Sequence, residues 1–475
     1  MKNKFLVFIY LIVTLILNIV SVSSGNTDDS LITVGYVSMF VLVLYLIFDY
    51  KINARFSFAS LFVIVLFVFH FGQLMLLTFF SNVYSHIRFM LLLDTKDALF
   101  GFRMMTMALS ALCLGILFQT SRSRQNSHSL KYSGLNWESI AKNIIYATFP
   151  IKLALDLATL AISFIDGGEA ARVFVNTFPN VVLFWGKISL LGFTLLLMAY
   201  KYKPGKQLWL FVGMMAYIMF MMLSGIRSEN VGYLLVILFI YLQSRAQSLK
   251  LRTAVIYGVL GFCALTFVVA AGKFRNYTDK GFDAFMELSG ELLTEQNVLL
   301  GLFDTCGDTG YTAIEVLNEW LPRNSPTYGD AYYKGIFAIF PNIIPSVIDF
   351  GAITEESACA SRLQKSDVLE SGYLNIGGSY FGEVFMNFGA YGGVFVCFLW
   401  GMFFGFISRN AVFAFNNEDM YSMILYISIM LAAVYWVRSH FGGGIREVVW
   451  DSLFGYYIVK RAIKSSNLNN KKVAK

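Results

Sequence analysis

The chain has 475 residues, of which 57% are hydrophobic and only 14% are charged, and its mean hydropathy is +0.62. This composition lies far from that of water-soluble domains, because no soluble core could hide so much apolar surface. The formal net charge of +7 would suggest nucleic acid as the partner of a soluble protein. In a membrane protein the same basic residues first report orientation, and we expect no nucleic-acid partner.

Apolar runs bounded by polar clusters predict about twelve transmembrane helices. A helix needs roughly 20 residues to cross the hydrocarbon layer, and most of the runs are near that length. In chain order the predicted spans are 5–23, 32–49, 57–80, 99–120, 144–165, 180–200, 207–224, 231–244, 253–272, 380–408, 420–437 and 448–462. The first run also has the form of a signal peptide, but it is long enough to span. The predicted fold class is an all-α polytopic membrane protein.

Basic residues between the spans predict the orientation of the chain. With both termini cytoplasmic, the basic segments share the inner side: Lys51/Arg55, Arg122/Arg124/Lys131/Lys142, Lys201/Lys203/Lys206, Arg245/Lys250/Arg252 and Lys460/Arg461/Lys464. We therefore predict nine spans within 1–272, one large extracytoplasmic loop over 273–379, three spans within 380–463 and a cytoplasmic tail over 464–475. Inside the loop, the patterns of 282–302, 311–321 and 336–348 indicate short helical or apolar stretches.

The cysteines are divided by this topology. Cys306 and Cys359 share the predicted outer loop, whereas Cys113, Cys263 and Cys397 lie in spans. Because disulfides form in oxidising compartments, the two loop cysteines either form a disulfide or remain as buried thiols. The sequence contains no nucleotide-binding glycine loop and no paired Cys/His spacing for a metal. We expect neither a metal nor another cofactor.

Several cations stand near the outer ends of the predicted spans, where basic residues should be depleted. They are Arg172, Arg227, Lys273, Arg275, Arg438 and Arg446. Guanidinium groups hold phosphate oxygens in bidentate fashion and stay charged at any relevant pH. The set therefore suits a lipid diphosphate headgroup. The alternative is that each cation pairs with a neighbouring acid or with ordinary phospholipid.

Two residues are rival candidates for a general base. His440 lies between Arg438 and a triple glycine, so nearby cations should lower its pKa and leave a neutral ring that accepts a hydroxyl proton. Glu383 stands near the outer end of a predicted span, four residues before Asn387. The alternatives are that His440 contacts a lipid headgroup and that Glu383 pairs with an arginine.

Small and charged residues within the spans indicate how the helices pack. Gly389/Gly393 and Gly401/Gly405 set up two faces for close helix approach. Lys152 and Asp156 are four residues apart and are expected to form an ion pair. Lys187 either faces the protein interior or extends outward to the membrane surface.

These features resemble the Wzy-type O-antigen and oligosaccharide repeat-unit polymerases. The resemblance covers nearly the whole chain through its dozen spans and late outer loop. The short motifs that carry it are Gly225-Ile226-Arg227, Phe340-Pro341 with Pro345, the run from Glu383 to Gly389, and the loop from Arg438 to Arg446. It implies a glycosyltransferase-C-like enzyme that builds O-antigen or capsule-type polysaccharide at the outer face of the bacterial inner membrane. A growing glycan would pass from one undecaprenyl diphosphate carrier to the terminal hydroxyl of an incoming lipid-linked repeat unit.

The resemblance also implies roles for the residues and partners. The expected catalytic residues are His440, Glu383 and Arg446, and the expected diphosphate ligands are Arg172, Arg227, Lys273, Arg275 and Arg438. Expected partners are undecaprenyl-diphosphate-linked oligosaccharides, membrane lipids, a chain-length regulator and a repeat-unit flippase.

Other classes of membrane protein remain open at this point. O-antigen ligases and other lipid-linked sugar transferases also use a histidine with arginines, but the large loop here contains no histidine to match the ligase pattern. A polysaccharide flippase or transporter should show repeat symmetry between its halves and shorter loops, and this sequence shows neither.

The predicted orientation can be tested with reporter fusions. Fusions at Asn324 and at Asn126 should report opposite sides of the membrane, because the first lies in the large loop and the second in a basic inner loop. Equal signals from the two fusions would contradict this topology.

Overall fold

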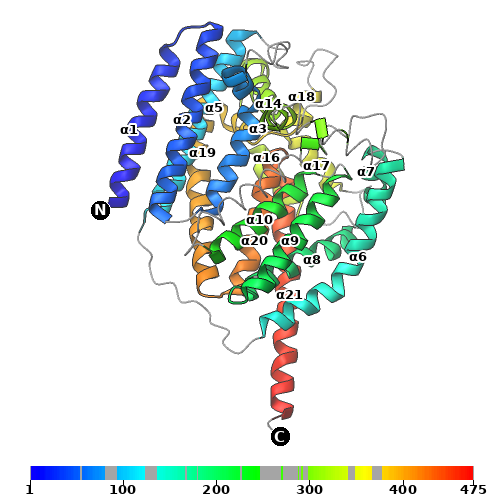
Figure 1. Cartoon of the computed structure of the whole chain (residues 1–475). Coiled ribbons are helices and arrows are strands. Elements are labelled where there is room, and N and C mark those ends of the chain that lie inside the picture. Colours follow the sequence, from blue (N-terminus) through cyan, green and yellow to red (C-terminus); the bar gives the residue numbers. More distant parts are fainter. Residues whose placement is uncertain are drawn as a thin grey trace. The chain divides into compact units, whose positions relative to one another are not determined.

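The computed structural model describes residues 2–53, 56–80, 94–122, 136–165, 168–178, 180–224, 227–245, 269–270, 287, 290–291, 298–340, 348–365 and 377–473. Within this part of the chain every regular element is a helix (Figure 1), so the predicted all-α class is confirmed. The chain divides into two compact units. The first comprises Met1–Gln125, Leu299–Asn410 and Ala432–Arg446, and the second comprises Asn126–Val298, Ala411–Leu431 and Glu447–Lys475.

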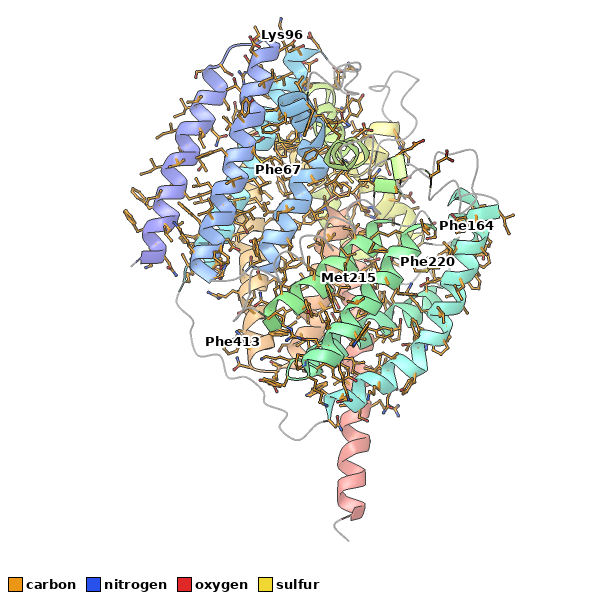
Figure 2. The ribbon with its side chains drawn as sticks, viewed as in Figure 1. Phe67, Lys96, Phe164, Met215, Phe220 and Phe413 are labelled. Carbon is orange, nitrogen blue, oxygen red and sulfur yellow. The ribbon has the colours of Figure 1, made fainter. Side chains whose placement is uncertain are left out.

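Four long helices begin the first unit: α1 (Lys2–Ser23), α2 (Asp28–Asn53), α3 (Phe58–Phe80) and α5 (Thr95–Thr120). α2 packs against the other three, and α1 also packs against α5. Figure 2 shows their side chains, with Phe67 of α3 buried and Lys96 exposed on the first turn of α5. Arg103 of α5 donates to the carbonyls of Ser21 (2.9 Å) and Gly25 (2.6 Å), which satisfies acceptors at the end of α1.

The second unit contains α6 (Trp137–Ile165), α7 (Gly168–Asn176), α8 (Asn180–Ala199), α9 (Pro204–Met222) and α10 (Arg227–Arg245). It also contains most of α20 (Met420–Trp436) and of α21 (Phe441–Val473). α8 packs against α6, α9 and α10. Pro204 stands in the first turn of α9, where a missing backbone N–H costs no helical hydrogen bond.

Seven helices of the described residues are long and apolar enough to cross a membrane: Asn3–Ser23, Asp28–Asn53, Phe58–Phe80, Thr95–Thr120, Trp137–Ile165, Pro204–Met222 and Tyr380–Asn416. Three shorter apolar helices are Trp185–Ala199, Asn230–Arg245 and Met420–Trp436. All of them coincide with predicted spans. The predicted span 253–272 lies almost wholly outside the described residues, and the predicted span 448–462 falls within α21.

Helix α19 (Tyr380–Asn416) is not one straight span, because it reverses direction at Gly389. Gly389 has φ 73° and ψ 175°, a conformation that is essentially restricted to glycine. The rings of Tyr380 and Trp400 both lie 4.8 Å from the ring of Trp436, although an unbroken helix would separate these residues by about 30 Å. The short arm 380–388 therefore folds back beside the long arm 390–416.

This reversal changes the interpretation of the two glycine pairs. In the long arm, Gly401 and Gly405 lie against the backbone of α5 at Leu112 and Ile116, as expected of a close helix contact. Gly389 is the hinge itself. Gly393 lies against Phe385, where an added Cβ would come 3.4 Å from the Phe385 Cα. The first pair therefore shapes the hairpin within α19 and does not form a contact face between helices.

From Leu299 on, the described part of the predicted outer loop is mainly helical and belongs to the first unit. Its elements are α13 (Val298–Cys306), α14 (Thr309–Glu315), the π-helical turn η1 (Val316–Trp320), α15 (Leu321–Arg323), α16 (Asp330–Phe337), α17 (Phe350–Ser357) and α18 (Cys359–Lys365). The helix predicted over 311–321 is confirmed. α14 packs against α3 and α5, and Gly307 lies against the backbone at Gly72. Part of the loop is thus buried among the long helices.

The hinge in α19 gives a stability prediction. Gly389→Ala should destabilise the folded protein by about 1–3 kcal/mol, because alanine has a Cβ that this backbone conformation does not tolerate. Thermal unfolding in detergent would measure the change. Gly392→Ala is the control, since that glycine is exposed and has an ordinary helical backbone. The Cβ that alanine adds there would come no closer than 3.4 Å to its neighbours. Equal midpoints for the two variants would contradict the strained hinge.

Candidate active site

Glu383 is a buried carboxylate at the meeting point of three helices. It stands on the short arm of α19 and is 1% exposed. Its carboxylate accepts hydrogen bonds from the indole Nε1–H of Trp436, at the end of α20, and from the backbone N–H of Phe441 (3.1 Å), the first residue of α21. A negative charge is favoured at a helix N-terminus by the exposed N–H groups and the helix dipole. Glu383 therefore holds the end of α20 and the start of α21 in place.

Asn387 continues this arrangement toward the large loop. Its amide nitrogen donates to the Glu383 carbonyl (2.7 Å), and its amide oxygen accepts from Thr327 Oγ1 (2.9 Å) and from the N–H of Ala331 (3.1 Å). Glu383 and Asn387, which the spacing of four residues places on one side of the helix, thus bind two different elements. Glu383 binds the start of α21, and Asn387 binds the start of α16.

The three glycines at the start of α21 allow backbones to approach closely. Gly442 lies against Gly335 of α16, where an added Cβ would come 3.1 Å from the Gly335 Cα. Gly443 lies against the ring of Tyr435, and Gly444 lies against Ala432 of α20. Any side chain at Gly442 would also collide with Thr354 of α17. The triple glycine is therefore required for packing between the loop helices and α21.

His440 immediately precedes α21 and is half-buried beside these glycines. Its Nε2 would lie 3.4 Å from a Cβ added at Gly443, so the absence of a side chain leaves space next to the ring. Burial, together with the charge of Arg446, lowers the pKa of His440 to about 4. The predicted lowering is found, but burial is its larger cause. The imidazole is therefore neutral near pH 7 and able to accept a proton.

Arg438 and Arg446 flank His440 in sequence and both are exposed. The guanidinium of Arg438 lies 6.0 Å from the ring centroid of Phe69, and its Nε would be 3.8 Å from a Cβ added at Gly377. Arg446 stands on the second turn of α21. Two permanent cations thus flank a neutral histidine in the chain, and the charge of one of them, Arg446, acts on its ring. Such a set of side chains suits an anionic substrate group with an adjacent hydroxyl.

The remaining predicted cations are less fully described. Arg172 lies in α7 and Arg227 begins α10, both in the second unit, and the placement of their side chains lies outside the described part of the chain. Lys273 and Arg275 also lie outside the described residues. Their roles stay predictions.

The two loop cysteines are both buried thiols, so the disulfide alternative is not realised in the structure. Cys306 ends α13, next to the contact between Gly307 and α3. Cys359 begins α18, and its thiol donates to the carbonyl of Ser379 (3.8 Å). Burial raises the pKa of the Cys359 thiol to about 12. Sharing a compartment did not bring the two sulfurs together, because each packs against a different neighbour.

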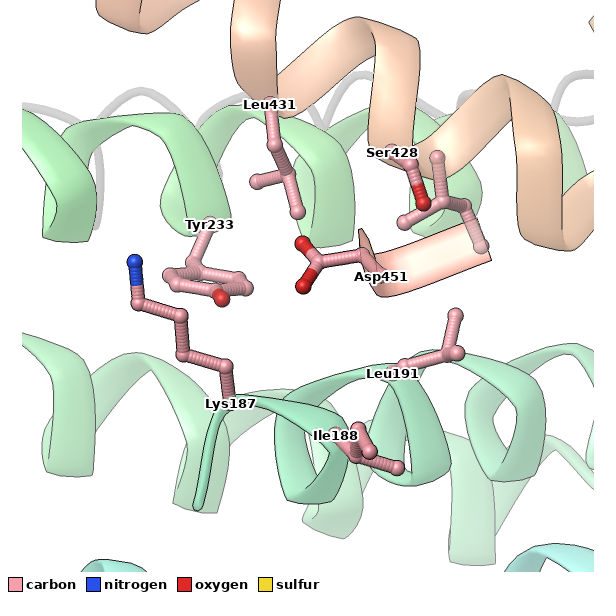
Figure 3. Close-up of a pocket in the computed structure, with 8 residues that line it drawn as sticks. Lys187, Ile188, Leu191, Tyr233, Ser428, Leu431 and Asp451 are labelled. Carbon is pink, nitrogen blue, oxygen red and sulfur yellow. The ribbon is translucent and has the colours of Figure 1, made fainter. Parts of the chain in front are cut away.

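Two lysines within helices of the second unit form ion pairs. Lys152 pairs with Asp156 (2.9 Å) as predicted, and Asp156 also accepts from Tyr217 Oη. Lys187 faces the interior, where its Nζ lies 2.9 Å from Glu447 Oε1 of α21. Figure 3 shows a small cavity with Lys187, Tyr233, Ser428 and Asp451 among its lining residues. These pairs neutralise charges that would be costly within a membrane.

Sequence reasoning missed two sets of residues around the site. An aromatic cluster surrounds the Glu383 contact, in which Tyr332 of α16 lies 5.1 Å from the Phe441 ring and 6.0 Å from the Trp436 ring. In the loop, Asp330 is paired with Lys334 (2.9 Å) and with Arg362. The acidic residue first in a short helix signals a helix start, but nothing in the sequence indicates Arg362 as its partner.

The family to which the chain belongs follows from a comparison of its sequence with protein-family models. The family described as O-antigen polysaccharide polymerase Wzy matches residues 5–471, nearly the whole chain. The chain belongs to the Wzy O-antigen polymerase family. It is an integral membrane enzyme of glycosyltransferase type that polymerises lipid-linked oligosaccharide repeat units. Searches of curated proteins and of solved structures gave no match. Of the residues described in this Wzy polymerase, no group of three His, Cys, Asp or Glu side chains could hold a metal ion.

The lowered pKa of His440 predicts how the Wzy polymerase responds to acid. Because the folded-state pKa is about 4 and the ordinary value is 6.5, the unfolded chain binds more protons between these limits. The contribution of His440 to stability is therefore complete above pH 6.5 and is lost as the pH falls toward 4. The wild-type protein should lose more stability over this window than His440→Gln, as measured by thermal unfolding. Parallel pH profiles of the two proteins would contradict a lowered pKa of His440 in the folded state.

Proposed function

We propose that repeat units are joined at the start of α21, with His440 as the general base and with Arg438 and Arg446 binding the diphosphate of the donor. The observation that carries this proposal is the half-buried imidazole of lowered pKa, on which the charge of Arg446 acts and which Arg438 and Arg446, both exposed, flank in the chain. Glu383, the rival base, is fully buried and already accepts hydrogen bonds from Trp436 and Phe441. Its role is to hold this site together.

The chemistry follows from the charges that develop. His440 takes the proton from the terminal hydroxyl of the incoming repeat unit, whose oxygen forms a bond to the anomeric carbon of the donor glycan. The bond from that carbon to the diphosphate oxygen breaks, and the lipid diphosphate leaves with the electron pair. Arg438 and Arg446 stabilise the negative charge that builds up on the leaving group. The imidazolium then releases its proton, since its pKa is well below neutral pH.

The setting of the reaction belongs to the same proposal. The carrier is undecaprenyl diphosphate, the site faces the outer side of the bacterial inner membrane, and both termini are cytoplasmic. Arg172, Arg227, Lys273 and Arg275 are further cations for the two diphosphates, one on the donor and one on the acceptor. A repeat-unit flippase supplies the substrate, and a chain-length regulator limits the product.

The test compares two replacements for the rival bases. His440→Ala should reduce polymer formation by roughly 100- to 10,000-fold, the usual contribution of a general base, while the protein remains folded. Glu383→Gln should instead lower thermal stability, because the amide is a weaker partner for two N–H donors. Polymer is measured by gel separation of the glycans. Imidazole added to His440→Ala should restore part of the activity.

The roles of Arg438 and Arg446 are tested by replacing each with lysine, which keeps the positive charge and removes the guanidinium group. Arg438→Lys and Arg446→Lys lose the planar fork, and the loss of about 2–4 kcal/mol of transition-state stabilisation predicts a fall of roughly 30- to 1000-fold in rate. Arg323→Lys is the control, because Arg323 is exposed and pairs with Glu319 (2.5 Å) on the preceding turn of the same helical segment. Normal polymer from His440→Ala and from both lysine variants would overturn the assignment of the site.

A further inference from the structure

The short helix α16 and the turn after it expose an apolar face. Tyr333 is 55% exposed, Ile336 50%, Phe337 39% and Phe340 52%. These positions follow one another at i, i+3, i+4 and i+7, the spacing of residues on one side of a helix. Phe350 of α17 extends the face, since its ring lies 6.0 Å from Phe337 and 5.5 Å from Phe340. Water-soluble surfaces rarely gather large apolar side chains in this way.

The opposite face of the same helix packs on the candidate active site. Tyr332 is half-buried and packs against Phe441 and Trp436, and Gly335 lies against Gly442. A displacement of α16 would therefore be transmitted to the start of α21 and to His440. Whatever contacts the exposed face of α16 also fixes the position of the candidate base.

The helix on which α16 packs indicates which environment its exposed face meets. Tyr332 stacks on Phe388 (5.6 Å) and approaches Trp400 (6.1 Å), so α16 rests on the hairpin of α19. The long arm of that hairpin belongs to a helix apolar enough to cross the membrane, and it exposes Tyr391 (78%) and Phe395 (62%). Through its opposite face, α16 thus packs on a hairpin whose long arm belongs to a helix apolar enough to cross the membrane.

The charged residues of α16 suit the same location. Lys334 stands between the apolar positions and pairs with Asp330 (2.9 Å), which is also bound by Arg362. Aromatic side chains with adjacent cations are typical of elements that lie at the boundary between lipid headgroups and acyl chains. Because α16 packs on a helix apolar enough to cross the membrane, lipid is favoured over a second protein as the occupant of its exposed face.

We propose that α16 lies in the bilayer interface, with Tyr333, Ile336, Phe337 and Phe340 inserted among the lipids, and that this insertion sets His440 at the depth of the lipid-linked diphosphate. The second part of the proposal rests on the function proposed for His440. The first part, insertion into the interface, is independent of that function.

Spin labels distinguish a lipid-facing from a water-facing position. In an active variant without native cysteines, labels are attached in turn at Ile336→Cys, Phe337→Cys and Glu355→Cys, and the protein is reconstituted in vesicles of phosphatidylethanolamine and phosphatidylglycerol. Glu355 is the control, because it is exposed on the neighbouring helix α17. Labels at 336 and 337 should collide more often with oxygen than with a water-soluble nickel complex, and the label at 355 should show the reverse.

Two results would overturn the interfacial location. Access of the nickel complex to 336 and 337 equal to that at 355 would place the face in water. Exclusion of both oxygen and nickel would mean that protein covers it, either a second copy or a partner. These readings do not depend on activity, so they separate the failure of this proposal from the failure of the proposed function.

An activity measurement tests the link to the site. Phe337→Asp should raise the KM for the lipid-linked substrate roughly tenfold, the factor that corresponds to lost interfacial burial of one such side chain. Phe337→Leu should behave as the wild type, because it remains apolar. Thermal unfolding in detergent checks that both variants are folded. An unchanged KM for Phe337→Asp in vesicles would contradict the proposed role of α16 in positioning the site.

Discussion

The contacts of the Glu383 carboxylate are the constraint on which the arrangement of the first unit depends. One buried group accepts from the indole of Trp436 and from the N–H of Phe441, so it joins the returning arm of α19 to the end of α20 and the start of α21. A buried carboxylate without donors would be very costly, and a helix start without an acceptor would leave N–H groups unsatisfied. The hydrogen bonds between them satisfy both the Glu383 carboxylate and the N–H group of Phe441. His440 is the residue directly before Phe441, where this anchored helix begins.

Glycine provides the second constraint, because helices in lipid gain little from burying apolar surface against one another. Contact must come from close approach of backbones. Gly335 meets Gly442 where α16 crosses α21, and Gly378 meets Ser439 just before His440. Gly307 meets Gly72 where the large loop descends between the long helices. The loop is thus held by backbone contacts that leave room for few side chains, and the candidate site is built where two of them converge.

The sequence predicted the helices well, because apolar runs of span length have few alternatives in a membrane. It also pointed to His440 between two arginines, since residue type and charge are local properties. It did not predict the reversal at Gly389, because hydropathy continues unbroken through 380–408 and carries no information on direction. The contact between Glu383 and Trp436 joins residues 53 positions apart, and Asp330 meets Arg362 across 32. Such pairings arise from the packing of whole helices and leave no mark in local pattern. The same holds for Cys306 and Cys359, because a shared compartment permits a disulfide but does not bring the two sulfur atoms within bonding distance.

The ion pair between Lys187 and Glu447 has a consequence for how the protein is made. α21 is not among the helices apolar enough to cross a membrane by themselves, and it carries both Glu447 and Asp451. Its partner lysine is synthesised 260 residues earlier, in α8. Translation from the N-terminus therefore delivers the neutralising cation before the carboxylate leaves the ribosome. Insertion of α21 into the membrane would therefore follow the synthesis of its counter-charge, so the order of translation spares the carboxylate an unpaired state in lipid.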